Sequence, residues 1–435
     1  MPGEGREPLV VLDDDPTGVQ TLAGIRVLLA WDPARIHAAL EGRSSAHLVT
    51  NTRALPEARV RPFVAAAARA ALDGVPDAAI VLRGDSTLRG HLLEEYLGVR
   101  DVVSPAGWPV LLLVPALPSA GRVTVGGVHL FDRDGRRTPL HDTEYARDGV
   151  FAYDSARLLE WADERSGGLF RAVAGRELHL AALRSRGPAA VAEGLLALAA
   201  SGDPAVFAPD AETVDDLDLV AQGYRAAAAQ GVSMIVRCAP SFAGVLAGTT
   251  ASALVPSPAA RDGVLVICGS YVAQSTRQLS KLLDSRPGSL VEADVLALAS
   301  DDPCLEIARL AAEISRHLAA DRLAVLATPR ERPAGTTSLD AGERIAGGLA
   351  RVVAAVAPSP SVLLAKGGIT SAVTLRDGVG AAEADVVGPV EPGVSLWSAR
   401  WPDGALLDYL VVPGNVGDDD LLARLVAAVT GSGAC

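Results

Sequence analysis

The chain has 435 residues, too many for one ordinary hydrophobic core, so two or three domains are expected. Hydrophobic residues make up 49% and charged residues 21%, a composition that excludes a largely disordered chain. The net charge of −13 and the 4% of aromatic residues argue against a nucleic-acid partner, because phosphate backbones attract positive charge and single strands need stacking rings.

Cysteine usage and hydropathy indicate a reducing compartment. The four cysteines, Cys238, Cys268, Cys304 and Cys435, show no zinc-ligand spacing and are expected to be small reduced thiols. The N-terminus lacks the apolar core of a signal peptide, and no uninterrupted apolar stretch of about 18 residues occurs. We therefore expect a cytoplasmic protein with no membrane-spanning helix and no membrane partner.

The first half alternates β-branched apolar runs with Ala/Leu/Arg-rich segments of helical period, which is the βαβα pattern of parallel-sheet proteins. The apolar runs predict strands over residues 8–12, 25–30, 46–50, 79–82, 110–114, 205–208 and 232–236. The helical periods predict helices over 56–73, 88–97, 155–165, 188–201 and 214–230. Glycine turns within 121–140 predict a hairpin inserted into this pattern.

Residues 248–263 are rich in proline and small residues and predict a linker. It separates a first domain, residues 1–247, from a second, residues 264–435. The second domain alternates again, with strands expected near 264–268, 323–327, 361–365 and 407–412 and helices near 274–284, 303–319, 340–356 and 418–429. The predicted fold class is α/β, with two domains of mainly parallel sheet and a ligand cleft between them.

Polar loops follow three predicted strands of the first half. The run LDDDPTG places Asp13, Asp14 and Asp15 directly after an apolar strand. Such crowded like charges need either water or a positive group opposite them. Two other strand ends, TNTR and RGDSTLRGH, supply Arg53 and Arg89. We expect one cleft in which carboxylates face a polyol hydroxyl or Mg²⁺ and arginines face an anionic substrate. The alternative for the triplet is a solvated turn.

Three turns of the second half share one arrangement of strand, glycine and helix: Gly269-Ser270, Gly367-Gly368 and Gly414–Gly417. In a parallel sheet they would lie at the carboxyl edge of the strands, where α/β proteins bind ligands. Glycine lets the backbone approach a phosphate, and Thr370 and Lys366 add a hydroxyl and a charge beside the second turn. One such turn alone is usually a tight connection, and neither a Walker P-loop nor a dinucleotide fingerprint is present.

Seven motifs occur in one order along nearly the whole chain: DDDPTG, TNTRALPEA, DSTLRGH, PALPSAGRVTVGGVHL, GSYVAQSTRQL, GGITSAVTL and PGNVGDDDLL. In this combination the chain resembles the four-carbon acid sugar kinase family. The resemblance implies an acid-sugar-binding N-terminal domain and a nucleotide-binding C-terminal domain. It further implies that ATP, with Mg²⁺, phosphorylates the terminal hydroxyl of threonate, erythronate or a 3-oxo-tetronate.

The resemblance also assigns site residues. Those matching the family's acid-sugar motifs are Asp14, Asp15, Thr17, Gly18, Asp85, Ser86, Thr87 and Arg89, and those matching its nucleotide motifs are Ser270, Gly367, Gly368, Ile369, Thr370 and Gly414. Asp15 or Asp14 would orient or deprotonate the attacking hydroxyl, and the other would help to hold the metal. Arg89 and Arg53 would hold the substrate carboxylate.

Three positions depart from the family pattern. Arg83 stands where many members have lysine, Ile369 where many have an acidic residue, and Val412 where many have lysine. Lys366 is our candidate to replace that last positive charge. Two other functions stay open: a nucleotide-responsive binding protein without turnover, and a metal-dependent hydrolase or lyase of sugar acids. The expected partners are a sugar acid and ATP, and a homodimer is left open.

Overall fold

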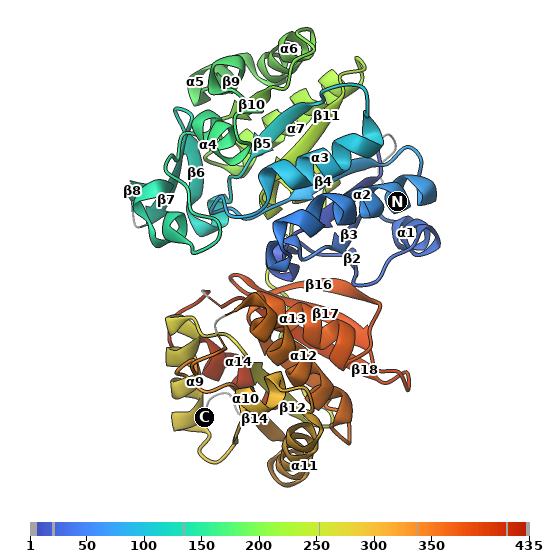
Figure 1. The fold of residues 1–435 in the computed structure, drawn as a ribbon, viewed down its shortest axis with the longest axis vertical. Coiled ribbons are helices and arrows are strands. Elements are labelled where there is room, and N and C mark those ends of the chain that lie inside the picture. The colour runs from blue at the N-terminus through green and yellow to red at the C-terminus, as the bar shows by residue number, and fades with distance from the viewer. Residues whose placement is uncertain are drawn as a thin grey trace. The chain divides into compact units, whose positions relative to one another are not determined.

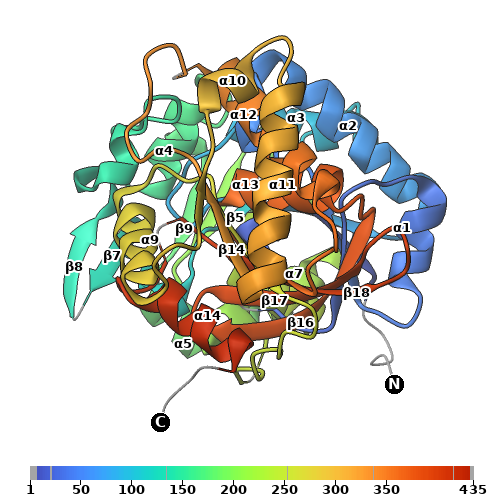
Figure 2. The ribbon, with the colours of Figure 1, turned by 90° about the horizontal axis from the view of Figure 1, so that it is seen from below.

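The computed structural model describes residues 7–19, 22–133, 135–251, 253–336, 338–414 and 416–431. Contacts within the chain divide it into two compact units, whose elements can be followed by residue number in Figures 1 and 2. Unit 1 comprises residues 1–18 and 31–250, and unit 2 comprises residues 19–30 and 251–435. Both units are α/β, so the predicted fold class is confirmed.

Unit 1 is built on a parallel sheet with the strand order β3-β1-β4-β11-β5-β10-β9. Its strands are β1 (Leu9–Asp13), β3 (Ser45–Val49), β4 (Ala79–Arg83), β5 (Val110–Val114), β9 (Arg176–Leu178), β10 (Val206–Pro209) and β11 (Met234–Cys238). The central strands are buried on both faces, which is why they read as continuous apolar runs rather than as alternating patterns.

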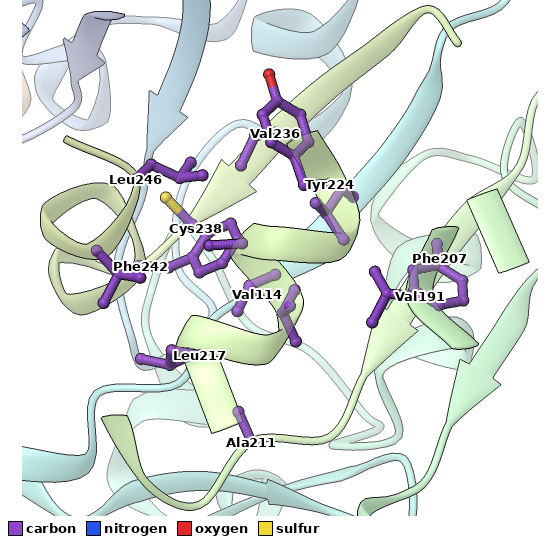
Figure 3. Packing of buried hydrophobic residues seen from close by; sticks show 14 of the residues in the cluster. Val114, Val191, Phe207, Ala211, Leu217, Tyr224, Val236, Cys238, Phe242 and Leu246 are labelled. Atoms are coloured by element: carbon purple, nitrogen blue, oxygen red, sulfur yellow. The ribbon is translucent and has the colours of Figure 1, made fainter. Parts of the chain in front are cut away.

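Helices cover both faces of this sheet. They are α1 (Pro33–Leu40), α2 (Glu57–Gly74), α3 (Leu92–Val103), α4 (Leu158–Arg165), α5 (Leu180–Arg186), α6 (Pro188–Ala199), α7 (Val214–Ala228) and α8 (Pro240–Ala247). Figure 3 shows the core on one face, where Val114 and Val236 of the sheet pack with Leu217, Tyr224 and Phe242 from α7 and α8. This core fixes the strands whose carboxyl ends carry the polar loops.

The predicted helix over 88–97 begins four residues later, at Leu92. Leu88 has a φ of 67° and Gly90 a φ of 123°, and a right-handed helix cannot contain either conformation. The motif DSTLRG is therefore a loop between β4 and α3, in which the Leu88 N–H donates to the Asp85 carbonyl at 3.1 Å and closes a turn. Because the loop is not helical, its side chains can point toward the neighbouring strand ends.

The predicted insertion is confirmed as a small antiparallel sheet with three strands: β6 (Arg122–Val125), β7 (Val128–Arg133) and β8 (Arg136–Pro139). Its tight turn is bound to the main sheet, because the backbone N–H groups of Gly126 and Gly127 donate to the buried Asp210 carboxylate at 2.8 and 2.9 Å. The small sheet is thereby fixed to the loop that follows β10.

Unit 2 contains a parallel group of strands in the order β13-β14-β12-β15-β18, extended by the antiparallel strands β17, β16 and β2. The bounds are β12 (Val264–Cys268), β13 (Leu290–Glu292), β14 (Leu323–Ala327), β15 (Val362–Lys366), β16 (Glu383–Glu391), β17 (Val394–Arg400), β18 (Leu406–Val412) and β2 (Ile25–Leu28). The strand expected over 25–30 thus exists but pairs with β16, although the sequence grouped it with the first domain. The ion pairs of Arg26 with Glu383 and Asp385, both at 2.9 Å, support this pairing.

The helices of unit 2 are α9 (Ala273–Ser285), α10 (Val295–Ala299), α11 (Cys304–Asp321), α12 (Leu339–Ala355), α13 (Gly368–Val373) and α14 (Leu421–Thr430). Leucines and valines of α9 and α14 pack on the sheet face that Val264, Val266 and Cys268 share. Helix α11 lies against β14, as Figure 2 shows. Among the described residues we find no helix with both the length and the apolar character needed to cross a bilayer.

Candidate functional site

The aspartate triplet lies at the carboxyl end of β1, where two neighbouring strands also end. Asp13 is aligned in register with Val49 of β3 and with Arg83 of β4. This register brings the Arg83 guanidinium to the triplet, where it binds the Asp13 carboxylate and lies 3.2 Å from Oδ1 of Asp14. Asp13, Asp14 and Arg83 are all almost completely buried.

Arg53, from the loop after β3, completes the charge pairing. Its Nε lies 2.9 Å from Oδ2 of Asp14, and its terminal nitrogens lie 3.0 Å from Oδ1 of Asp14 and 3.2 Å from Asp15. The crowded carboxylates therefore face guanidinium groups, and the solvated-turn alternative is wrong for Asp13 and Asp14. Asp15 differs from them, because 18% of its side chain is exposed.

The surroundings of Asp14 and Asp85 shift the pKa values of these two carboxyls in opposite directions. Burial raises the pKa of Asp14 to about 7, although Arg53 acts in the opposite direction. Burial also favours protonation of Asp85, but Arg89 and Arg53 outweigh it and hold the pKa of that carboxyl below its usual range. Asp14 can therefore exchange a proton near neutral pH while Asp85 stays ionised.

The DSTLRG loop joins the same cluster. The Thr87 hydroxyl donates to Oδ2 of Asp85, and Nε of Arg89 donates to the same oxygen at 2.7 Å. Arg89 also lies 3.6 Å from Asp148. Gly90 closes the loop, and a Cβ at this position would lie 2.9 Å from a terminal nitrogen of Arg237 and 3.4 Å from Oδ2 of Asp14. Glycine therefore lets the loop lie close to both side chains.

The structure brings most of the sequence-predicted acid-sugar residues together: Asp14, Asp15, Arg53, Asp85, Thr87 and Arg89. Ser86 lies in the same loop, and its carbonyl faces Nε2 of His129 at 2.9 Å. Gly18 lies against the Arg83 guanidinium, where any side chain would collide with it. The side chain of Thr17 lies outside the described part of the chain.

Two buried residues of this cluster were missed by the sequence analysis. Glu95 of α3 accepts a hydrogen bond from the Thr52 hydroxyl at 2.5 Å and pairs with Arg237 of β11. The Arg237 guanidinium in turn lies against Gly84 and Gly90, so the Glu95–Arg237 pair supports the DSTLRG loop. Neither residue lies in a polar motif, and a single arginine inside an apolar strand gave no signal of its partner.

Arg122 is the third residue that the sequence analysis passed over. It begins β6, within the GRVTVGGVH motif, and its guanidinium carbon lies 4.8 Å from the ring centre of Phe131 and 6.0 Å from that of Tyr145. Arg89 lies 5.5 Å from the same Tyr145 ring. Among the described residues Arg122 has no carboxylate at ion-pair distance, and its buried Nε has no hydrogen-bond partner. It carries positive charge that no neighbouring acid balances.

The charge balance of the whole cluster explains why Arg122 matters. Four arginines face six carboxylates: Arg53, Arg83, Arg89 and Arg237 against Asp13, Asp14, Asp15, Asp85, Glu95 and Asp148. Each of these arginines is therefore already paired. An incoming carboxylate would meet uncompensated positive charge only at a group such as Arg122.

The glycine turns of unit 2 converge at the carboxyl ends of β12, β15 and β18. A Cβ on Gly414 would lie 3.0 Å from the Ser270 hydroxyl, and a Cβ on Gly269 would lie 2.6 Å from Oγ1 of Thr370. A Cβ on Gly367 would lie 3.2 Å from Cβ of Ser270. Ser270, Gly367, Thr370 and Gly414 are thus adjacent, and the absence of side chains at the glycines lets the three turns pack closely together. Gly368 begins α13, and Ile369 beside it is half exposed.

Lys366 does not project beside the glycine turn as the sequence analysis expected. Its side chain is fully buried, and Nζ donates to the Pro413 carbonyl at 2.6 Å. The residue is aligned with Cys268 on one side and Val412 on the other. The ammonium thus lies next to the position of the missing lysine, but beneath the third glycine turn. Burial lowers the pKa of Lys366 to about 8.

These arrangements fit the groups that the resemblance implied. The close packing of the glycine turns brings the Ser270 and Thr370 hydroxyls together with the backbone of three strand ends, a set of groups that suits a phosphate. In the part of the chain that the structure describes, no three His, Cys, Asp or Glu side chains are grouped so that they could hold a metal ion. Mg²⁺ in phosphoryl-transfer sites is held mainly by phosphates, waters and one or two carboxylates, so it needs no such group.

Comparison with known protein families follows the two units except at residues 19–30, which belong to unit 2 but lie within the first match. Residues 9–246 match a family model described as a sugar-binding N-terminal domain, and residues 265–422 match one described as a nucleotide-binding C-terminal domain. The matches define the class of protein: a two-domain α/β chain in which a domain of the sugar-binding model is followed by a domain of the nucleotide-binding model. The chain belongs to the four-carbon acid sugar kinase family.

Two curated relatives carry more specific names. The chain is 32% identical over 279 residues to a D-erythronate kinase of Heliobacterium modesticaldum, an alignment that covers 62% of this chain and spans 58% of that protein. It is 29% identical over 331 residues to a D-threonate kinase of Salmonella typhimurium, which covers 74% of this chain and 72% of the relative.

Solved structures share the fold at low sequence identity. A Haemophilus influenzae protein from a domain family of unknown function superposes with a TM-score of 0.65 at 16% identity, covering 96% of this chain and 99% of its own. A Salmonella typhimurium LT2 protein described as a candidate tRNA synthase gives a TM-score of 0.69, also at 16% identity, covering 97% and 98%. These likenesses show the architecture only.

Proposed function

We propose that this protein is an ATP-dependent kinase that phosphorylates the terminal hydroxyl of a four-carbon sugar acid. The observation that carries the proposal is the cluster at the end of β1, where the partly exposed Asp15 stands beside the buried Asp14–Arg53 pair. The names of the two curated relatives support erythronate and threonate as the first substrates to test. A 3-oxo-tetronate is the third.

Asp15 is our candidate for the general base. It is the carboxylate of the triplet that a bound hydroxyl can reach, since Asp13 and Asp14 are each about 1% exposed. In the reaction the terminal hydroxyl oxygen bonds to the γ-phosphorus of ATP, and the bond from that phosphorus to the β–γ bridging oxygen breaks. The hydroxyl proton passes to Asp15, and ADP leaves. Asp14 holds Arg53 in place and sets the local charge.

The substrate carboxylate is assigned to the group of side chains formed by Arg122, Arg89 and Tyr145. Arg122 supplies positive charge that no neighbouring acid among the described residues balances. Arg89 and Arg122 both lie close to the Tyr145 ring. Arg53, the other expected carboxylate ligand, is already bound to Asp14 and Asp15. Its proposed role is to hold the base rather than the substrate.

In unit 2 the nucleotide phosphates would approach the backbone of Ser270, Gly367, Thr370 and Gly414, with Gly368 and Ile369 lining the turn. Lys366 supports this turn from beneath through Pro413. Mg²⁺ would neutralise phosphate charge when bound. A reducing compartment such as the cytoplasm and a homodimer stay predictions.

The experiment is a screen for ADP release with the full chain, ATP, Mg²⁺ and each four-carbon acid in turn. ADP released in step with consumption of one acid supports the kinase. Binding of ATP and acid without turnover would favour the regulatory alternative. Conversion of an acid without ATP would favour the hydrolase or lyase.

A further inference from the structure

A pair of arginines lies beside the first glycine turn of unit 2. Arg330 and Arg332 follow β14, and their guanidinium carbons lie 5.8 and 4.5 Å from the ring centre of Tyr271. Tyr271 directly follows Ser270 in the turn between β12 and α9. Arg332 is exposed and Arg330 is half-buried. Two like charges therefore share one aromatic ring at the carboxyl edge of the sheet.

The donors of Arg330 bind backbone at two strand ends. One terminal nitrogen donates to the Ser270 carbonyl at 2.9 Å, and the other donates to the Thr328 carbonyl at 2.7 Å and contacts the Cys268 carbonyl at 3.3 Å. Carbonyl oxygens orient the guanidinium but do not cancel its charge. Arg330 thus fixes the position of the Ser270 turn and contributes a positive field to it.

Glu331 lies between the two arginines in the sequence. Within the described ranges, however, no carboxylate, Glu331 included, lies at ion-pair distance from Arg330 or Arg332. Other arginines of unit 2 are paired, for example Arg277 with Asp419 at 2.9 Å and Arg376 with Asp377 at 2.7 Å. In a chain with a net charge of −13, two arginines that lie next to the Ser270 turn without an ion-pair partner among the described residues point to an anionic ligand.

The other source of positive charge in this region cannot serve that ligand directly. The ammonium of Lys366 is fully buried and donates to the Pro413 carbonyl. Its position is beneath the third glycine turn rather than on it. The charge that a polyphosphate requires must therefore come from elsewhere, and the loop after β14 supplies it next to Ser270.

We propose that Arg332, stacked on Tyr271 and supported by Arg330, forms the subsite that binds the terminal phosphates of the nucleotide. The inference rests on the proposed nucleotide-binding function of unit 2. A guanidinium can hold two phosphate oxygens at once, and the contact with the ring limits the directions that Arg332 can take. Arg332 is the phosphate contact, and Arg330 is a positioning residue for the Ser270 turn.

The test measures binding of ATP, AMP and inorganic tripolyphosphate by calorimetry to the full chain and to variants. Arg332→Ala should weaken ATP and tripolyphosphate by about 10- to 100-fold, because a hydrogen bond to a charged group is lost. AMP should change much less, and Arg332→Lys should recover part of the loss. The salt dependence of ATP binding should also become weaker in Arg332→Ala.

Arg316→Ala is the matched control, because Arg316 is an exposed arginine of α11 that lies 3.7 Å from Glu313. It should leave all three affinities unchanged. Arg330→Lys tests the positioning role of Arg330 separately from the phosphate contact of Arg332. It should weaken ATP binding less than Arg332→Ala does.

An Arg332→Ala protein that is folded and binds ATP like the wild type would overturn the inference. So would an equal loss for ATP and AMP. Failure of the proposed kinase function gives a different result, in which the wild type binds ATP with the expected Arg332 dependence but turns over no acid. A wild type that binds neither ATP nor tripolyphosphate would overturn both proposals.

Discussion

Asp14 and Arg53 form a two-point ion pair, with Nε–Oδ2 and NH2–Oδ1 distances of 2.9 and 3.0 Å. The same guanidinium lies 3.2 Å from Asp15, so one arginine holds two adjacent carboxylates. The two carboxylates are not equivalent, because Asp14 is 1% exposed and Asp15 is 18% exposed. Because Asp14 is buried and Asp15 is accessible, while both pair with Arg53, we expect the two carboxylates to have different roles.

The first prediction separates those roles. Asp15→Asn keeps the shape of the side chain but removes the proton acceptor, so turnover should fall by about 10²- to 10⁴-fold while the acid still binds. Steady-state kinetics with ADP detection and calorimetry with the acid measure the two effects. Asp203→Asn, an exposed aspartate of unit 1, should behave like the wild type. If Asp14→Asn is inactive and Asp15→Asn is active, the base is Asp14.

The second prediction concerns stability and pH. Since the pKa of Asp14 is raised to about 7 from 3.8, the folded protein binds this proton more tightly than the unfolded chain does. The contribution of Asp14 to the free energy of unfolding is therefore greatest below pH 3.8 and falls as the pH rises through 7. Asn cannot titrate. The difference in unfolding free energy, wild type minus Asp14→Asn, should fall by up to about 4 kcal/mol across this window.

Urea unfolding of both proteins at several pH values measures this difference, and groups common to both proteins cancel in it. A constant difference would mean that Asp14 stays ionised throughout the range, held in that state by Arg53 and Arg83.

Much of the fold could be predicted because the buried strands have unambiguous patterns. VLLLV at 110–114 and LAVLA at 323–327 are fully buried strands, as their continuous apolar character indicates. The antiparallel strands β16 and β17 were missed. Their residues include Gly388, Pro389 and several charged residues, which weaken any period of two, and β16 also pairs with β2, which lies far away in sequence. Burial by distant partners gives no local signal.

The sequence predicts the site residues that lie in recognisable motifs. It does not predict the site residues that only tertiary packing brings together. The triplet and Arg53 lie in polar loops at strand ends, and strand register alone brings them together. Glu95 and Arg237 meet only through the fold, 142 positions apart. Lys366 was expected beside a phosphate, yet the alternation of β15 turns it into the sheet face covered by α9 and α14. Because side chains alternate between the two faces of a strand, a shift of one residue would put Lys366 on the opposite face of the sheet.

The third prediction tests the carboxylate assignment. Arg122→Ala should raise KM for the sugar acid by about 10-fold or more with a small change in kcat, because a charged hydrogen bond is lost in the ground state and the transition state alike. Arg122→Lys should recover part of the affinity, since an ammonium keeps the charge but loses the planar fork. Arg133→Ala is the control, because exposed Arg133 also contacts Phe131, at 5.4 Å. If Arg89→Ala raises KM and Arg122→Ala does not, the carboxylate binds at Arg89.

The fourth prediction tests the role of the glycine turns of unit 2 in nucleotide binding. A side chain at Gly414 would extend toward the Ser270 hydroxyl, 3.0 Å from its Cβ, and Cγ2 of Val272, 3.5 Å away. Gly414→Val should therefore displace the turn and weaken ATP binding by about 10-fold or more, the equivalent of roughly 1.4 kcal/mol. Acid binding by unit 1 should stay within about twofold, a change worth less than about 0.5 kcal/mol. Calorimetry with each ligand separately gives both values.

Gly347 provides the matched control for that substitution, because a Cβ there meets nothing within 4 Å. Gly347→Ala lies inside α12, so it should leave ATP affinity unchanged and raise stability by about 1 kcal/mol through better helix propensity. If Gly414→Val does not fold, Gly414→Ala places only the Cβ against Ser270 and should still weaken ATP binding. A folded Gly414→Val protein with wild-type affinity for ATP would show that the phosphates do not approach this turn, and the nucleotide assignment would then have to move away from Ser270 and Gly414 together.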